Sequence, residues 1–442
     1  MMKSQTKCSC VSFDIGIVGN LNIAIVCEGF SRRSLLFQPW HRVHAISRRM
    51  AARKDLRVFI ISDKTSNSNE IEEIDGITVS RVNRLKLLGI FGRRNLEEAV
   101  SKNDPDIVVW YGSPLSATYL NQLRGIGKPV IWDIDVDLPV SRTLSRLSFR
   151  ELFNLDHNLF LPQLFTIIYP KFVMKLVANS RFVSRIIVPS QSLKDSMCKI
   201  GVVPEKIRII PSAIERMGSN KFEDEKWLQR SAFGFGQKEF IVTYFGSPCT
   251  LRGTDTIVMS MQKILASKKN VKLVILSRRK TSDSSPDRHL NNEEDYLRKL
   301  IKRNRIDQSV QIITGIMDKA QLINYLIVSD VIVLPFKIIF SEPPLSVLEA
   351  MDLGKVVVTT DFDALSEIIG EDRGILVEPS NVQALAQAIL FLYDHPETAA
   401  QIAKKARDFA ADLWDWDEVT LRFEKLLSET VTERCLSEKL SQ

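Results

Sequence analysis

The chain has 442 residues, of which 45% are hydrophobic and 26% charged, and its formal net charge is +7. This length suits two domains of about 200 residues, and the composition excludes a disordered or fibrous chain. No apolar run reaches the roughly 18 residues of a membrane-spanning helix, and with no signal peptide expected the six cysteines predict a reduced, cytoplasmic protein.

The charge is unevenly distributed along the chain. Residues 1–215 hold 30 Lys and Arg against 20 Asp and Glu, hence +10, whereas residues 216–442 hold 30 against 33, hence −3. A basic N-terminal half suggests an acidic partner: anionic lipid, nucleic acid or a phosphorylated substrate. A basic solvated surface without a partner would have the same composition.

The first half alternates apolar, β-branched runs with amphipathic ones, which predicts strands followed by helices. The predicted strands cover residues 22–29, 57–62, 77–82, 106–112, 129–137, 185–190 and 206–214. The predicted helices cover residues 40–54, 96–103, 117–127 and 191–201. This alternation is typical of a parallel sheet with helices on its faces.

The second half repeats the alternation after a polar, irregular stretch at residues 216–230. Its predicted strands cover residues 240–246, 272–277, 310–315, 331–336 and 356–360. Its predicted helices cover residues 253–267, 295–304, 319–329, 345–353 and, in the last part, 382–427. A restart of this kind indicates a second α/β domain.

We therefore predict two doubly wound, Rossmann-like α/β domains that face each other across a cleft. The N-terminal domain is expected over residues 1–220 and the C-terminal domain over 221–415. A helix that returns toward the first domain and a frayed tail are expected over residues 416–442. In open α/β sheets ligands bind beyond the carboxyl ends of the strands, so candidate site residues are sought there.

The stretch SEPPLSVLEAMDLGKVVVTT, residues 341–360, follows such a strand end. One of its two prolines suits the first position of a helix, where a missing N–H costs nothing. Gly354 is placed to end that helix, and the apolar run after it is the next strand. The helix start, with Glu342 before it and Glu349 on it, would thus face the cleft.

Residues 180–427 carry motifs that resemble the donor-binding domain of the retaining glycosyltransferases of family 4, which have the GT-B fold of two Rossmann domains. The matching stretches are VPSQSLKDSMCKIGVVPEKIRIIPSAI (188–214), YFGSPCTLRGTDT (244–256), SEPPLSVLEAMDLGKVVVTTDFDALSEII (341–369) and RGILVEPSNVQALAQAI (373–389). The N-terminal half is similar only in its pattern. The resemblance implies transfer of a sugar from a nucleotide-sugar donor to an acceptor.

The resemblance also implies roles for residues around the helix start. In the family, two glutamates separated by seven residues hold the donor, and Glu349 matches the one that binds the ribose. Glu342, separated from it by only six residues, matches the one that meets the donor sugar, and Ser341 occupies the nominal place. The backbone N–H groups of Leu345 and Ser346 would face the diphosphate.

A second family motif follows the first strand of the C-terminal domain. The family usually has Gly-Arg there and Lys-Gly five residues on; here Ser247 stands in place of the arginine and Arg252 in place of the lysine. A guanidinium can clamp a diphosphate with two hydrogen bonds, and Gly246 and Gly253 allow close backbone approach. We expect Arg252 and Glu342 to be the catalytic residues.

Three other residues are implied by the same resemblance. Arg278 and Arg279, after the next strand, are candidates to replace the missing charge, and Glu367 matches a further family glutamate. The fold requires neither a metal nor a cofactor, so the nucleotide-sugar is expected as substrate alone. No nucleic-acid partner is expected for a transferase of this type.

The acceptor side is expected in the N-terminal domain. Asp133, Asp135 and Asp137 end a predicted strand, and Tyr111 stands about where the family often has a histidine. The aspartates fit a solvated strand end as well as they fit a functional cluster. The apolar segment 157–177 reads as core helices or as a surface that dips into a membrane interface.

The resulting hypothesis is a retaining, hexosyltransferase-type enzyme (EC 2.4) that acts on a lipid-linked glycan, a polysaccharide or a similar acceptor. It would be cytoplasmic, or peripheral at the inner membrane face. One alternative is a catalytically silent relative that serves as a binding partner. Another is a nucleotide-sugar epimerase or hydrolase on the same fold. Neither the nucleotide, the sugar nor the oligomeric state follows from the sequence.

Overall fold

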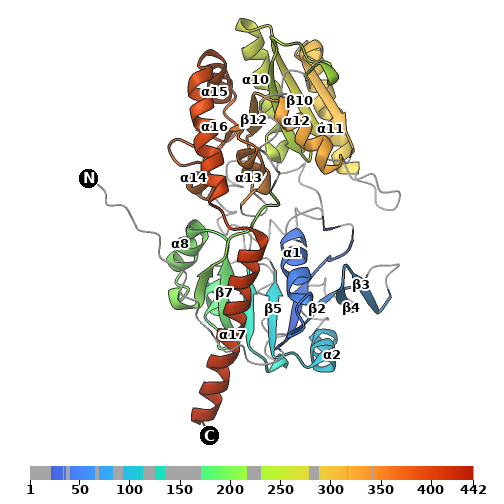
Figure 1. Cartoon of the computed structure of the whole chain (residues 1–442), viewed down its shortest axis with the longest axis vertical. Helices are drawn as coiled ribbons and strands as arrows, with labels where there is room; N and C mark the ends of the chain where they lie inside the picture. Colours follow the sequence, from blue (N-terminus) through green and yellow to red (C-terminus); the bar gives the residue numbers. More distant parts are fainter. Residues whose placement is uncertain are drawn as a thin grey trace, which may run out of the picture.

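The computed structural model describes residues 21–32, 34–35, 40–64, 69–82, 93–112, 125–134, 171–216, 230–277, 288–315, 317–339 and 343–441. Within them the chain forms two α/β units, each built around its own sheet (Figure 1). The two parallel sheets confirm the predicted fold class of two Rossmann-like domains.

The first sheet has the strand order β3-β4-β2-β1-β5-β6-β7-β8, and only its edge pair β3–β4 is antiparallel. Its strands are β1 (Leu21–Cys27), β2 (Leu56–Asp63), β3 (Ile71–Ile74), β4 (Ile77–Val82), β5 (Ile107–Tyr111), β6 (Val130–Asp133), β7 (Val183–Val188) and β8 (Ile207–Ile209). Its helices are α1 (Trp40–Ala51), α2 (Arg93–Asn103), α7 (Lys171–Ala178), α8 (Gln191–Lys199) and the 3-10 turn η2 (Pro204–Lys206). Strand β3 was not predicted, because two of its four residues are glutamates.

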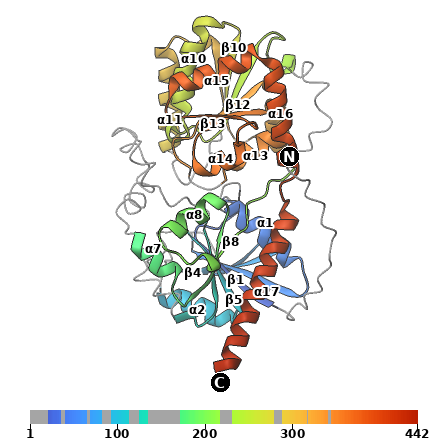
Figure 2. The ribbon, with the colours of Figure 1, turned by 90° about the vertical axis from the view of Figure 1, so that its left-hand side faces the viewer.

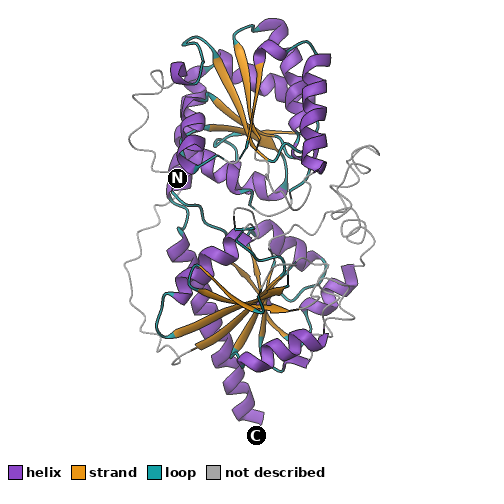
Figure 3. Cartoon of the chain, turned by 90° about the vertical axis from the view of Figure 1, so that its right-hand side faces the viewer, coloured by secondary structure: helices purple, strands orange, loops and turns teal. Residues whose placement is uncertain are grey.

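The second sheet has the order β11-β10-β9-β12-β13-β14, and its pairs are parallel. Its strands are β9 (Phe240–Gly246), β10 (Val271–Ser277), β11 (Val310–Thr314), β12 (Val331–Leu334), β13 (Val356–Thr360) and β14 (Ile375–Val377). The connecting elements are η4 (Thr250–Arg252), α10 (Thr254–Ser267), α11 (Arg288–Arg303), η5 (Asp307–Ser309), α12 (Lys319–Val328), α13 (Leu345–Asp352) and α14 (Asp363–Ile369). Helices cover both faces of this sheet (Figure 3).

The last part of the chain forms three helices rather than one. These are α15 (Val382–Asp394), α16 (Pro396–Ala411) and α17 (Trp416–Ser441), with breaks at His395 and at residues 412–415. Helix α17 leaves the second unit and packs along α1 of the first (Figure 2). It buries Trp416, Phe423 and Leu427 in the same core cluster as Ile46 of α1.

The frayed tail expected at the end of the chain is instead helical through Ser441. Two contacts with the first unit explain the difference. Arg185 on β7 forms an ion pair with Glu433, and Arg434 donates to the Gly127 carbonyl oxygen at 3.4 Å. These partners lie far away in the sequence, so the local pattern gave no sign of them.

Two arginines hold the segments that connect the units. Arg42 on α1 donates to the carbonyl oxygens of Ile210 and Pro211 at 3.0 and 2.9 Å, where the chain leaves the first sheet. Arg216 donates to the carbonyl oxygen of Leu413 at 2.7 Å and also caps the end of α16. The outgoing and returning segments are therefore tied to each other by a single guanidinium.

Candidate functional site

The segment from β9 to α10 forms a tight turn at the carboxyl end of the second sheet. Two glycines bracket it, Gly246 with φ 136° and Gly253 with φ 77°, and both angles lie in the region that favours glycine. A Cβ on Gly253 would lie only 1.9 Å from the carbonyl oxygen of Pro335, which follows β12. Glycine is required there because the two backbones meet.

This Arg252 turn, residues 247–253, is fixed by bonds from three other segments. The Tyr244 hydroxyl donates to the Ser247 carbonyl oxygen at 2.6 Å. The buried carboxylate of Glu293 on α11 accepts from the Thr250 N–H at 2.8 Å. The Leu251 carbonyl oxygen accepts from the N–H of Lys337 at 2.9 Å. Such fixed backbone leaves little reorganisation for binding.

The guanidinium of Arg252 lies near Phe336, after β12, and near Gly246, at the end of β9. Its Cζ lies 5.9 Å from the ring centre of Phe336, and its Nη1 is the second nearest atom, at 3.6 Å, to a Cβ built on Gly246. The side chain is half-buried, and no carboxylate in the described part of the chain forms an ion pair with it. It can therefore offer its donors to an anionic ligand.

A second cation, Lys337, lies under the same turn but is already paired. Its Nζ is 2.7 Å from Oδ2 of Asp255 in the first turn of α10, and the side chains are 4% and 10% exposed. The ion pair joins the segment after β12 to the helix after β9. Lys337 thus stabilises the turn, and its charge is compensated by Asp255.

Two groups beside Arg252 are held in their neutral forms. Burial, together with the Glu293 carboxylate, raises the pKa of the Cys249 thiol to about 11. Burial also raises the pKa of the Tyr244 phenol. Neither is a nucleophile or base at neutral pH, so the chemistry this turn can supply is charge stabilisation by Arg252.

Helix α13 begins after Pro344, at the same carboxyl end of the second sheet. Val347 and Leu348 are buried in the core, whereas Leu345, Ser346 and Glu349 are half-buried. The first N–H groups of a helix lack intrahelical partners and carry its positive dipole end. Helix α13 thus brings donors for an anion and one carboxylate to the strand ends.

Four residues predicted for this region lie outside the described residues, namely Ser341, Glu342, Arg278 and Arg279. Their roles stay predictions. A small hollow does lie beside Gly246, at the carboxyl ends of β9, β10 and β11. It is lined by Phe245, Gly246, Leu276, Gly315, Met317 and Leu322.

The acceptor-side candidates lie in the first unit. Tyr111 and Asp133 are paired residues at the ends of β5 and β6, and both are buried. Asp133 is 3.4 Å from Arg42, with side-chain exposures of 3% and 2%, so its carboxylate serves the connection between the units. Asp135 and Asp137 lie outside the described residues. The acceptor role of these four stays a prediction.

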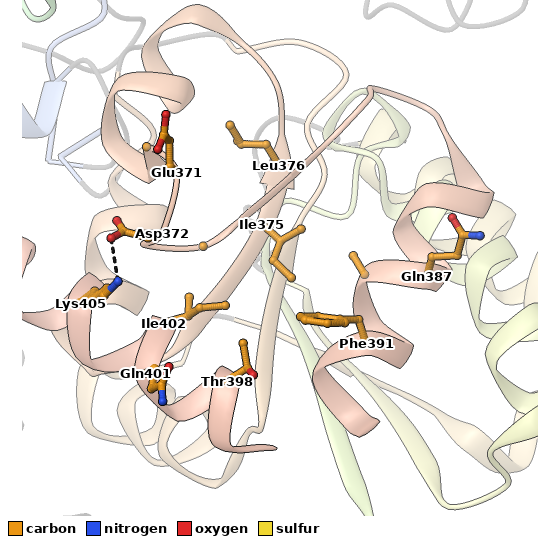
Figure 4. A pocket seen from close by; sticks show the side chains of 13 residues that line it. Glu371, Asp372, Ile375, Leu376, Gln387, Phe391, Thr398, Gln401, Ile402 and Lys405 are labelled. Atoms are coloured by element: carbon orange, nitrogen blue, oxygen red, sulfur yellow. Dashed lines mark hydrogen bonds and ion pairs between the residues drawn. The ribbon is translucent and has the colours of Figure 1, made fainter. Parts of the chain in front are cut away.

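A larger cavity of about 750 Å³ opens elsewhere, between β14, α15 and α16 (Figure 4). Ile375 and Phe391 line it, and the ion pair of Asp372 with Lys405, 2.8 Å long, lies at its rim. None of the residues predicted for the site lines this cavity. Sequence reasoning therefore points to the Arg252 turn and not to this cavity.

In the described part of the chain, His, Cys, Asp and Glu side chains form no group of three or more that is suited to a metal ion. The helices described there are also too short or too polar to cross a bilayer.

Two family models match the chain, one in each half. Residues 225–409 match the model described as glycosyl transferases group 1, and residues 41–216 match the one described as Glycosyltransferase Family 4. Together the matches follow the two structural units in chain order.

Curated relatives match shorter stretches. TuaC of Bacillus subtilis, described as a teichuronic acid biosynthesis glycosyltransferase, is 34% identical over 96 residues, 22% of this chain and 24% of TuaC. Glycogen synthase of Mycobacterium tuberculosis is 30% identical over 128 residues, 29% of this chain and 30% of that protein. The chain thus aligns with less than a third of either relative.

Solved structures are similar over nearly the whole chain. Sucrose-phosphate synthase from Thermosynechococcus elongatus has a TM-score of 0.71 at 18% identity, covering 93% of this chain and 100% of that one. HepE of Anabaena, solved with UDP-glucose, has a TM-score of 0.69 at 15% identity, covering 92% and 100%. WaaG, involved in lipopolysaccharide biosynthesis, has 0.63 at 15%, covering 91% and 99%. These neighbours confirm the GT-B fold.

Proposed function

We propose that this chain, whose second half matches the model of glycosyl transferases group 1 and whose first half matches that of Glycosyltransferase Family 4, transfers a sugar from a nucleotide-sugar to an acceptor with retention of anomeric configuration. This would place it among the family 4, hexosyltransferase-type enzymes (EC 2.4). The donor would bind at the carboxyl ends of β9 and β12, and the acceptor would approach from the first unit.

The observation that carries the proposal is the fixed position of Arg252 at the carboxyl end of the second sheet, the end at which α13 also begins. When the bond from sugar to diphosphate breaks, negative charge grows on the leaving oxygen, and preorganised donors stabilise it best. Arg252 extends from a turn held by Glu293 and Lys337, and α13 offers the N–H groups of Leu345 and Ser346. No metal is needed for this charge stabilisation.

The sugar and ribose would be held by carboxylates. Glu349 is half-buried one turn into α13, where its oxygens can accept from the ribose hydroxyls, while Glu342 would contact the donor sugar. The acceptor hydroxyl would attack from the face that the diphosphate leaves and pass its proton to a departing phosphate oxygen. The configuration at the anomeric carbon would then be kept.

The nucleotide base would lie against the mouth of the hollow beside Gly246, whose volume of about 20 Å³ is too small to admit the ring itself. Its apolar lining by Leu276 and Met317 suits the face of a planar ring. Because HepE, with the same fold, is solved with UDP-glucose, UDP-sugars are the first donors to test. The sequence motifs themselves fit any ribonucleotide.

A glycan on an anionic or lipid-linked carrier is proposed as acceptor. The named relatives act in teichuronic acid biosynthesis or as glycogen synthase, and the first half of this chain is basic. On α7, Phe172 and Leu176 are 61% and 60% exposed, next to the exposed Lys171 and Lys175. Apolar and basic side chains on one helix support peripheral binding to an anionic membrane.

The direct test is a thermal-shift screen against UDP-, GDP-, ADP- and dTDP-sugars, with Glu349→Ala in parallel. Binding to the folded state raises the melting temperature by mass action. We expect a shift with one donor class that is lost in the variant. Nucleotide release in the presence of a cell extract as acceptor then measures transfer. No shift with any donor, for a protein that unfolds cooperatively, would contradict the proposal.

The second candidate is a catalytically silent relative that acts as a binding partner. It is favoured by Ser247, which gives no charge where the family has arginine, and by the pairing of Lys337 with Asp255. Donor binding without any turnover would support this candidate, and measurable transfer would exclude it.

A further inference from the structure

One side chain of the second unit reaches the start of a helix in the first. Oε1 of Glu367 on α14 accepts a hydrogen bond from the backbone N–H of Ser192, the second residue of α8. The two helices pack against each other at this point. Figure 1 shows α14 directly above α8, on the side where the two units meet.

The positions of the two helices place this contact between the carboxyl ends of the two sheets. Two residues separate the end of β7 from the start of α8, and two separate the end of β13 from the start of α14. Both therefore lie at the carboxyl ends of their sheets, which is also where the Arg252 turn lies. A bond between them fixes how far apart the two strand ends stand on that flank.

The contact provides a hydrogen-bond acceptor for an N–H group that α8 cannot pair within itself. Its first N–H groups have no intrahelical partner. The Ser190 hydroxyl accepts from the Leu193 N–H at 3.1 Å, and Glu367 accepts from the Ser192 N–H. A carboxylate at this position also interacts favourably with the positive end of the helix dipole.

The acceptor is held in place from its own side. Nη2 of Arg373 donates to the backbone carbonyl oxygen of Glu367 at 2.8 Å. The Arg373 guanidinium also lies 4.1 Å from the ring centre of Phe409 on α16. The backbone of Glu367 is thus held by the second unit. The bond to Ser192 therefore fixes where α8 lies relative to that unit.

We propose that Glu367 is a positioning residue of the second unit that caps α8 of the first and thereby sets the distance between the donor and acceptor sides. Its part in sugar transfer rests on the proposed function, whereas the cap itself does not. Glu367 acts on the relative placement of the two units and touches no substrate. This role differs from that of Glu349, whose expected partner is the ribose.

The cap can be observed without any activity assay. Among the residues that the structure describes, the Ser192 N–H has Glu367 as its one acceptor. Residue-resolved hydrogen–deuterium exchange at Ser192 therefore reports this bond, with the Ser190-bonded Leu193 amide as internal reference. We expect slow exchange in the wild type, fast exchange in Glu367→Ala, and slow exchange in Glu367→Gln, whose amide oxygen still accepts. Equal Ser192 exchange in the wild type and Glu367→Ala would overturn the proposal.

Two further variants separate the cap from a general loss of structure. Glu371→Ala removes an equal charge from an exposed neighbour that faces the cavity of Figure 4, and should leave Ser192 exchange unchanged. Ser192→Pro removes the donor at a first-turn position that tolerates proline. If both substitutions act by removing the same bond, the double variant Glu367→Ala with Ser192→Pro should lose no more stability than either single variant.

Kinetics then test the positioning role. Loss of a helix cap changes an equilibrium by about fivefold, so we expect the transfer kcat of Glu367→Ala to fall by about that factor, while KM for the donor changes less than twofold. Glu367→Gln should restore most of kcat. If Glu367→Ala speeds exchange of the Ser192 amide but leaves kcat unchanged, the positioning role is overturned. A wild type that transfers no sugar would refute the proposed function, and the exchange result would still decide the cap.

Discussion

The ammonium of Lys337 lies 2.7 Å from the carboxylate of Asp255, and both side chains are buried beneath the turn that carries Arg252. The same lysine donates its backbone N–H to Leu251 in that turn. One residue therefore connects the segment after β12, the turn after β9 and the first turn of α10. The candidate donor site is built on this connection.

Replacing Lys337 by methionine should strongly destabilise the second unit. The aliphatic chain would still fill its space, but Asp255 would be left buried without its cation, which costs roughly 3–5 kcal/mol. Urea denaturation should show this loss. Lys405→Met is the matched control, because its ion pair with Asp372 is exposed on both sides and is worth about 0–1 kcal/mol. Equal losses in the two variants would contradict the expectation.

Gly253→Ala should damage the Arg252 turn through a backbone collision. The control is Gly234→Ala: both glycines have φ 77°, but a Cβ on Gly234 would meet nothing within 4 Å. Gly234→Ala should cost only the strain of the backbone angle, about 1–2 kcal/mol. Gly253→Ala should cost more and also abolish the thermal shift with donor. The proposal fails here if the two variants bind donor equally well.

Arg252→Lys should keep the fold and lose turnover. An ammonium retains the charge but not the planar pair of donors that matches a diphosphate, and a charged hydrogen bond is worth about 1.5–3 kcal/mol. We expect kcat/KM for transfer to fall roughly tenfold or more. Arg303→Lys, on the exposed end of α11, is the control. An Arg252→Lys variant that works at the wild-type rate would show that catalysis does not need the guanidinium.

His44 should make stability depend on pH in the mildly acidic range. Burial lowers its pKa below the ordinary 6.5, and the neighbouring Asp75 carboxylate only partly opposes this. The unfolded chain therefore binds the proton more readily, and the stability due to His44 is present above pH 6.5 and is lost as the pH falls toward the folded-state pKa. Melting temperatures from pH about 7 to about 5 should fall less in His44→Gln than in the wild type or in His395→Gln.

The elements of the site could be read from the sequence because they are local. One short stretch contains Gly246, Arg252 and Gly253. The spacing of apolar residues around Glu349 predicts the helix that carries it. Glu293 and Lys337 could not be found this way, since they are single polar residues in other segments and reach the Arg252 turn only through the fold.

Asp133 illustrates the same limit from the other side. Its place at a strand end was correctly inferred, and β6 does end there. The surroundings of Asp133 could not be inferred, because its partner Arg42 lies 91 residues earlier, on α1. A strand end can be predicted from a run of apolar residues, whereas the partner of a charge at that end depends on which helix covers it.

The return of α17 to the first unit also has a consequence for how the protein is made. Trp416, Phe423 and Leu427 complete an apolar face whose other residues, such as Ile46 and Ile60, lie near the start of the chain. A ribosome adds about 5–20 residues per second, so this face waits for some tens of seconds before its cover is synthesised. During that time the first unit is exposed to chaperones and to aggregation, because the whole second unit must be synthesised before α17 can complete the first.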